Sequence, residues 1–163
     1  MDIPAKARAV IIGGGVVGCS IAYHLGKLGW TDVVLLERKQ LTCGTTWHAA
    51  GLIAQLRATQ NMTRLAKYSQ ELYFGLEEET GVATGFKRNG SITVALTDER
   101  MEELRRSAAM ARAFGVEIDE IRPSDIQSRY PGLTVDDAVG GVWLPKDGQA
   151  AVSYTHLRAH ETV

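Results

Sequence analysis

Four residues near the start of the chain have types and spacing suited to binding a nucleotide. Gly13, Gly15 and Gly18 form the pattern G-x-G-x-x-G, and Glu37 lies 24 residues after Gly13. Between a strand and a helix, such glycines permit a tight turn, close approach of the backbone to a pyrophosphate, and close helix–strand packing. The helix N-terminus then faces the phosphates. A carboxylate at the position of Glu37 binds ribose hydroxyls and repels a 2′-phosphate, which argues against NADP. The pattern predicts a dinucleotide site but does not separate FAD from NAD.

The surrounding sequence predicts the βαβ unit that must position these residues. A short apolar run at 9–12 is typical of a buried parallel strand. Apolar residues at helical spacing predict a helix over 17–28, with Gly29 at its end. Residues 33–36 read as a second buried strand, which ends at the predicted ribose-binding acid. Strand, glycine turn, helix and strand in this order form a βαβ unit with a right-handed crossover.

The rest of the chain predicts a mixture of helices and strands. The expected elements are a Thr-, Gly- and Ala-rich loop over 41–51; an amphipathic helix over 62–79 with Met62, Leu65, Ala66, Leu72, Tyr73 and Leu76 on one side; a hairpin over 86–96 with Asn89-Gly90 as a type I′ turn; a helix over 97–114 capped by Thr97 or Asp98; a half-buried strand over 116–121; a capping box over 124–127 that opens a short helix before Pro131; and a strand over 140–144.

Composition and charge exclude several classes of function. The chain has 163 residues, of which 45% are apolar and 23% charged, as in ordinary globular proteins. A net charge of −1 gives no electrostatic case for nucleic acid or for an anionic membrane. The apolar runs are far shorter than the roughly 20 residues of a membrane span. Two cysteines make no disulfide framework, and the N-terminus does not read as a signal peptide. We therefore expect a cytoplasmic protein without a metal site.

The C-terminal string VSYTHLRAHET, residues 152–162, resembles one translated frame of a transposase adapter used in DNA sequencing libraries. We therefore exclude residues 151–163 from fold reasoning. A genuine polar helix is the alternative. The adapter interpretation implies that the natural gene continues past about Ala150 and that the chain is a truncated N-terminal fragment.

The segment LTCGTTWHAAGL, residues 41–52, narrows the type of dinucleotide. Together with VIIGGGVVG and LLER before it, it resembles the dimethylglycine and sarcosine dehydrogenase group of the glycine-oxidase-like flavoproteins, which includes bacterial 4-methylaminobutanoate oxidases. The resemblance runs from about Ala9 to Ala150, through NGSITVAL and GGVWLPKDGQA. It implies an α/β fold, with a Rossmann-like FAD-binding βαβ unit followed by the start of an α+β substrate domain. The first part of a discontinuous FAD-binding domain would cover 1–85, and the substrate domain would begin at 86–150.

The resemblance also assigns a role to a histidine. In this group the histidine of the TWHAAG segment is bonded covalently to the 8α carbon of the flavin. In this sequence that histidine is His48. A neutral imidazole offers a ring lone pair for such a bond, and the 8α methyl becomes electrophilic when the flavin tautomerises. The alternative is a loop histidine bonded to backbone, with FAD held noncovalently. His24 reads as structural, and Cys43 receives no catalytic role.

The glycine motif and the resemblance together imply a set of FAD-binding residues. Residues 44–46, which are small or carry hydroxyls, would lie beside the pyrophosphate and the ribityl chain. Trp47 would pack near the flavin or in a core. Residues 51–52 would lie beside the isoalloxazine. The implied residues are Gly13, Gly14, Gly15, Val16, Val17, Gly18, Glu37, Arg38, Gly44, Thr45, Thr46, Trp47, His48, Ala49, Ala50, Gly51 and Leu52. No catalytic residue is expected within the chain.

The resemblance implies oxidation of an N-methyl amine by hydride transfer to FAD. The resulting iminium is hydrolysed to amine and formaldehyde or passed to tetrahydrofolate, and oxygen or an electron-transfer flavoprotein takes the electrons. The substrate pocket and any folate domain would lie beyond Ala150, so we expect the fragment to be inactive alone. The sequence does not decide whether the substrate is sarcosine, dimethylglycine or 4-methylaminobutanoate. It also does not decide whether the enzyme is an oxidase or a dehydrogenase. One alternative is a non-catalytic relative such as the regulatory subunit of pyruvate dehydrogenase phosphatase. Another is an NAD-dependent dehydrogenase, which leaves TTWHAAGL unexplained.

Overall fold

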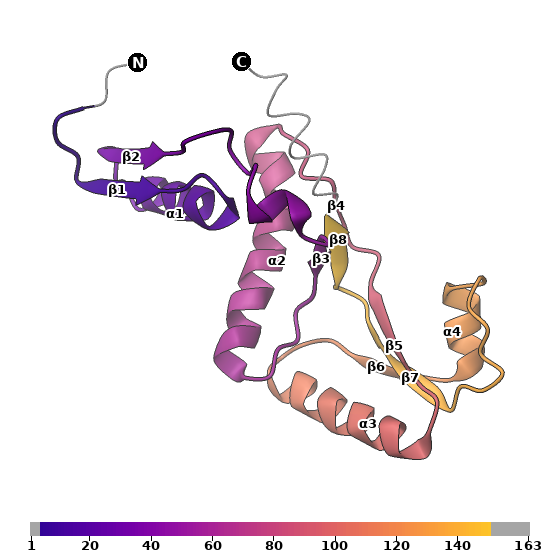
Figure 1. The fold of residues 1–163 in the computed structure, drawn as a ribbon. Coiled ribbons are helices and arrows are strands. Elements are labelled where there is room, and N and C mark those ends of the chain that lie inside the picture. Colours follow the sequence, from indigo (N-terminus) through magenta and orange to yellow (C-terminus); the bar gives the residue numbers. More distant parts are fainter. Residues whose placement is uncertain (1–3, 151–163) are drawn as a thin grey trace. The chain divides into compact units, whose positions relative to one another are not determined.

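The structure, a computed structural model, describes residues 4–150, which fall into two compact units, 4–50 and 51–150. In the first unit (Figure 1), strand β1 (Ala9–Ile12) leads into helix α1 (Val16–Lys27) and then strand β2 (Val33–Leu36). The two strands are parallel, and their pairing runs in register from Ala9 opposite Val33 to Ile12 opposite Leu36. The predicted βαβ unit is therefore confirmed, with element ends within a residue of expectation.

The strands of this unit are less buried than the sequence predicts. Ile11 is 8% exposed, whereas Val10 is 55% exposed and Ile12 is 87% exposed. A parallel strand is buried when neighbouring strands and helices cover both of its faces. Within residues 4–150 this sheet has two strands and one covering helix, so the prediction of fully buried strands is wrong here.

In the second unit, strands β5 (Ser91–Ala95), β7 (Gly140–Leu144) and β6 (Asp119–Ile121) form an antiparallel sheet in the order β5-β7-β6. Helices α3 (Asp98–Ala113) and α4 (Pro123–Arg129) pack on opposite faces of it. A Cβ on Gly140 would point toward Met101 of α3, whereas a Cβ on Gly141 would point toward Ile126 of α4. Because consecutive strand residues face opposite sides, this glycine pair lets both helices approach β7 closely.

The core of the second unit lies between α3 and this sheet. Thr97 caps α3, because its hydroxyl oxygen accepts a hydrogen bond from the Arg100 N–H at 3.2 Å. Of the two predicted caps, Thr97 and Asp98, the structure therefore has Thr97. The buried apolar side chains come from α3, from the segment after it and from the sheet. They are Ala95, Met101, Leu104, Ala108, Ala111, Val116, Ile118, Val142 and Leu144.

The predicted hairpin over 86–96 is wrong. Strand β4 (Phe86–Lys87) pairs with β8 (Gly148–Ala150), and β5 pairs with β7. Strand β3 (Leu52–Ile53) takes the other side of β8, which gives a second antiparallel sheet in the order β3-β8-β4. Gly90 has a φ of +73° but Asn89 does not have a positive φ, so the type I′ turn is absent. Instead the Gly90 N–H donates to the Asp147 carbonyl at 2.8 Å, so residues 86–95 lie beside the distant segment 140–150 and do not fold back on themselves.

Helix α2 (Gln60–Thr80) forms as predicted, but its predicted apolar side is covered only in part: Ala66, Leu72, Tyr73 and Leu76 are half-buried. Met62 and Leu65 are exposed, whereas Thr63 and Gln70 are fully buried. Gln70 accepts a hydrogen bond from the Gln55 side-chain amide at 3.0 Å and donates to the Lys146 carbonyl. Buried amides are retained when they are hydrogen-bonded, so α2 contacts its neighbours through polar side chains that a hydrophobicity pattern does not detect.

Two shorter elements also differ from expectation. The strand predicted over 116–121 begins at Asp119, although Val116 and Ile118 are buried as expected. The predicted capping box over 124–127 is displaced: α4 starts at Pro123, and the Asp125 carboxylate accepts the Arg122 N–H at 3.2 Å. Within residues 4–150, no helix is both long and apolar enough to cross a membrane. The mixed architecture confirms the predicted α/β class, and the predicted domain boundary after residue 85 stays a prediction.

Candidate functional site

The glycine loop between β1 and α1 has the conformation that its sequence requires. Gly13 has a φ of +105°, a region that side chains disfavour, and its N–H donates to the Leu36 carbonyl at 2.8 Å. A Cβ on Gly18 would come within 1.9 Å of the Gly13 carbonyl oxygen. The loop therefore turns tightly at Gly13, and α1 packs directly against that turn at Gly18.

The N-terminus of α1 can receive an anion. Gly15 is its N-cap residue and offers no side chain, and the first turn of α1 has no acidic residue. The Val16 N–H donates to the Thr46 hydroxyl oxygen at 3.0 Å. Within residues 4–150, the N–H groups of Gly15 and Val17 form no hydrogen bond. Unpaired N–H groups and the helix dipole together favour a phosphate at this position.

Glu37 follows β2 and turns its carboxylate to the glycine loop. Its Oε2 accepts the Gly14 N–H at 2.8 Å and its Oε1 accepts the Lys39 N–H at 3.0 Å. These two hydrogen bonds, the one from Gly14 first, lower the pKa of Glu37 below its ordinary value. Each oxygen of an ionised carboxylate has a second lone pair, so Glu37 is able to accept ribose hydroxyls as well.

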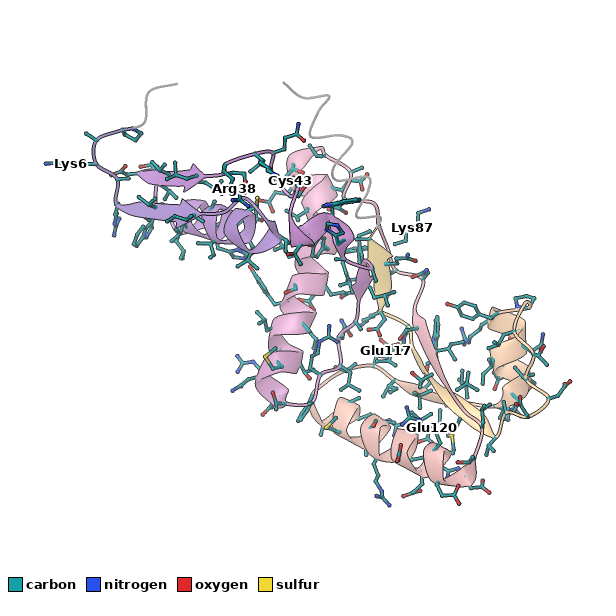
Figure 2. The ribbon with its side chains drawn as sticks, viewed as in Figure 1. Lys6, Arg38, Cys43, Lys87, Glu117 and Glu120 are labelled. Carbon is teal, nitrogen blue, oxygen red and sulfur yellow. The ribbon has the colours of Figure 1, made fainter. Side chains whose placement is uncertain are left out.

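A hollow of about 650 Å³, within the size range of ligand pockets, lies over this loop; we call it the loop hollow. Figure 2 labels Arg38, just after β2, and Cys43, in the segment that leads to the next helical turn; both line it. Eleven predicted site residues line the hollow. They are Gly13, Gly15, Val16, Val17, Gly18, Glu37, Arg38, Gly44, Thr45, Thr46 and Ala49.

Other predicted residues do not line the loop hollow. Gly14 donates its N–H to Glu37 without lining the hollow, and Trp47, His48 and Ala50 belong to the same unit but not to the lining. Gly51 and Leu52 belong to the second unit, where Leu52 pairs with Gln149 of β8.

The sequence reasoning missed further residues in the lining. Lys39 follows Arg38 directly, and a pair of cations after the acid was a signal for an anionic ligand. Thr42 has a φ of +64°, in the left-handed region, and its N–H donates to the Gly14 carbonyl at 2.8 Å. No local pattern marks Thr42, since this contact depends on the fold. Ile11, Ile12, Ile21 and Cys43 complete the lining.

The segment after Gly44 forms a single 3-10 turn, η1 (Thr45–His48), within the predicted loop. Nδ1 of His48 lies 3.1 Å from the Gly44 carbonyl oxygen, and the ring centroids of Trp47 and His48 are 4.2 Å apart. A carbonyl oxygen only accepts, so in this contact Nδ1 carries the proton, and in a neutral imidazole Nε2 is then the nitrogen with the lone pair. His48 is exposed, which leaves Nε2 free to react.

Both cysteines are free thiols. Burial raises the pKa of the Cys19 thiol, whose sulfur lies 3.5 Å from the Gly14 carbonyl oxygen. Such a thiol stays protonated and packs beneath the glycine loop. Within residues 4–150, no three His, Cys, Asp or Glu side chains gather in a way that could hold a metal ion.

The fold and the loop hollow together define a dinucleotide-binding βαβ unit. The close approach at Gly18, the unpaired N–H groups and the carboxylate of Glu37 fit the adenosine and pyrophosphate parts of such a cofactor. Comparison with known families supplies the type: the DAO family, "FAD dependent oxidoreductase", matches residues 8–160. The chain therefore belongs to the DAO family of FAD-dependent oxidoreductases. The matched residues 151–160 lie outside the described ones, and the adapter interpretation of that segment remains a prediction.

The chain is similar to several proteins over nearly all of its length. It is 42% identical over 147 residues to mitochondrial sarcosine dehydrogenase of Mus musculus, a match that covers 90% of the chain and 16% of that protein. It is 41% identical over 145 residues to the mitochondrial pyruvate dehydrogenase phosphatase regulatory subunit of Mus musculus, which covers 89% and 16%. The structure of L-proline dehydrogenase from P. horikoshii matches with a TM-score of 0.85 and 30% identity, and covers 94% of this chain and 40% of that one. The chain thus spans about a sixth of the length of these two curated relatives.

Proposed function

We propose that the chain is part of an enzyme that uses FAD to oxidise an N-methyl amine of the sarcosine, dimethylglycine or 4-methylaminobutanoate class. The observation that carries the proposal is the loop hollow, whose cofactor-binding features occur in a chain 42% identical to a sarcosine dehydrogenase. FAD would supply the hydride acceptor at its flavin ring. The residues of this chain would hold and orient it.

The proposed grip has three parts. The N-terminus of α1, with the N–H groups of Gly15 and Val17, binds the pyrophosphate. Glu37 accepts the ribose hydroxyls, and Arg38 lies beside it in the lining of the loop hollow. The remaining predicted residues, at 44–52, follow the ribityl and the isoalloxazine.

We propose in addition that His48 is bonded to the flavin. Nε2 would attack the 8α carbon, while the 8α methyl and the imidazole each give up one proton. Molecular oxygen would take the two electrons of the broken C–H bond, so the bond between His48 and the flavin would form without any other oxidant. The exposed ring of His48, with Nδ1 held at the Gly44 carbonyl, supports this assignment.

The finer parts of the reaction are proposals of the same kind. Oxygen or an electron-transfer flavoprotein would accept the electrons, and tetrahydrofolate would take the one-carbon unit if a folate domain follows. The first domain would include residues 1–85 and the substrate domain would begin at 86–150. The sarcosine dehydrogenase relative is named as mitochondrial, and we propose the cytoplasm for this protein on its sequence alone.

The test uses the complete protein. It is denatured in acid, and the flavin that stays with the polypeptide is measured for the wild type and for His48→Ala. We expect flavin to stay with the wild type and to be released from the variant. Formaldehyde release is then measured with sarcosine, dimethylglycine and 4-methylaminobutanoate. Free release of flavin from the wild type contradicts the covalent bond, and absence of flavin altogether contradicts the whole proposal.

A second candidate function is a non-catalytic, regulatory one, favoured by the 41% identity to the phosphatase regulatory subunit. The same experiment separates the two, because a regulatory protein would bind FAD yet release no formaldehyde with any of the three amines. The membership of the FAD-dependent family sets aside the NAD-dependent alternative.

We also predict that the polypeptide Met1–Ala150 is inactive by itself. It matches only 16% of the length of sarcosine dehydrogenase, and the described part of its β1-β2 sheet leaves apolar side chains exposed. Expression of this polypeptide as a soluble, yellow, cooperatively folding protein that oxidises sarcosine would overturn the prediction.

A further inference from the structure

The N-terminus of α1 receives its cap from a distant part of the chain. A helix N-cap is usually a side chain that accepts an N–H of the first turn, but Gly15 has none to offer. The Thr46 hydroxyl, 30 residues further on, accepts the Val16 N–H at 3.0 Å in its place. A Cβ on Gly15 would lie only 3.2 Å from that oxygen, so the absent side chain of Gly15 makes room for Thr46.

Thr46 is also part of the turn that contains His48. Its carbonyl oxygen accepts the Ala49 N–H at 3.2 Å, which closes η1. The side chain of Thr46 therefore joins η1, the turn that contains His48, to the N-terminus of α1. Among the described contacts, the side-chain hydrogen bond that joins η1 to α1 is the one that this hydroxyl accepts.

We propose that Thr46 is a positioning residue that couples occupancy of the pyrophosphate grip to the placement of His48 for bonding to the flavin. The inference rests on the proposed FAD site and the proposed covalent bond. A hydroxyl accepts and donates at the same time. While its oxygen holds the Val16 N–H, its own O–H is able to donate to a phosphate oxygen at the helix end. Phosphate, helix and η1 then share one hydrogen-bonded junction, and the imidazole is fixed relative to the bound cofactor.

The coupling predicts that loss of this hydroxyl affects attachment more than binding. Thr46→Val keeps the side-chain volume and β-branching but can neither accept nor donate. The remaining N–H groups and Glu37 still bind the cofactor. We expect covalent attachment to become about tenfold slower, because the imidazole is no longer fixed relative to the bound cofactor. We expect the noncovalent dissociation constant for FAD to change less than about threefold.

The experiment uses the complete protein, produced without flavin in a riboflavin-starved host and then mixed with FAD. The rate of covalent attachment is read as flavin fluorescence on the denatured polypeptide. The noncovalent dissociation constant is measured separately in a His48→Ala background. Thr46→Ser keeps the hydroxyl and should attach flavin at nearly the wild-type rate. Thr31→Val, an exposed threonine between α1 and β2, is the matched control and should match the wild type. Thr46→Ala replaces the valine variant if that variant does not fold.

Each outcome decides the inference. Slow attachment in Thr46→Val with an unchanged dissociation constant and rescue by serine supports it. An unchanged rate, an equal loss of binding and rate, or failure of serine to rescue overturns it. If wild-type protein binds FAD but never attaches it, the covalent bond and this inference both fail while the FAD site stands. If wild-type protein binds no FAD, the proposed function itself fails.

Discussion

Gly18→Ala tests how closely α1 must approach the turn at Gly13. The added Cβ would lie 1.9 Å from the Gly13 carbonyl oxygen, whereas real Cβ atoms essentially never come within 3.0 Å of such an atom. The helix or the turn must therefore retreat by about 1.1 Å. Overpacking of this kind costs about 1–3 kcal/mol of stability. The obstacle is a backbone atom, so no side-chain rotation relieves it.

The same displacement should weaken the cofactor site, because the turn that moves also carries the N–H groups of Gly15 and Val17. We expect FAD to bind about tenfold more weakly. Gly26→Ala is the matched control: Gly26 lies in the same helix, and a Cβ there meets nothing within 4 Å. Replacing a helical glycine by alanine should stabilise the protein by about 0.5–1 kcal/mol.

The assay compares the two variants with the wild type in the complete protein. Urea unfolding of the flavin-free form gives the change in stability, and FAD titration in a His48→Ala background gives the dissociation constant. The two glycine variants should shift stability in opposite directions. If Gly18→Ala unfolds like the wild type and binds FAD as tightly, the close packing inferred at this turn is wrong.

Three further predictions concern single side chains. Glu37→Gln should weaken FAD binding. Because hydrogen bonds hold the pKa of Glu37 below the ordinary 4.5, its ionised form contributes stability above that pH, which is lost as the pH falls through its lowered pKa; urea unfolding from pH 7 to pH 3 should show a smaller loss in the variant. Asp147→Ala should destabilise by about 1–3 kcal/mol, because this carboxylate is 3% exposed and accepts two hydrogen bonds, whereas exposed Asp136→Ala should have little effect. Thr97→Ala should cost about 1 kcal/mol through loss of the α3 cap, and Thr97→Ser should restore most of it.

Thermal or urea unfolding checks the last two, with the exposed aspartate and the serine variant as references. Equal effects of the two aspartate variants would contradict the buried role of Asp147. A pH profile of Glu37→Gln identical to that of the wild type would contradict the predicted contribution of its ionised form.

Much of the first unit was predictable because its signals are local. An apolar run, a glycine triplet, a helical repeat and an acid at the right distance specify β1, α1, β2 and Glu37 within a few tens of residues. Gly13 needs its positive φ and Gly18 its missing side chain for reasons that depend on their immediate neighbours. The helix over 98–113 was equally clear, because its cap and its charged turn are adjacent in sequence.

Only the tertiary structure decided which segments pair and which surfaces are buried. Asn89-Gly90 has the sequence of a hairpin turn, yet β4 pairs with β8 and β5 pairs with β7, because strand pairing depends on partners distant in the chain. The fully buried side chains of α2 are polar, and Gln70 is hydrogen-bonded to Gln55 and Lys146, which no hydrophobic periodicity reveals. The cap that Thr46 provides to α1 spans 30 residues in the same way. The sequence by itself determined the glycine loop, the helix that follows it and the position of Glu37, since these features are local. The contact that joins the N-terminus of α1 to the turn of His48 arises only when the chain folds.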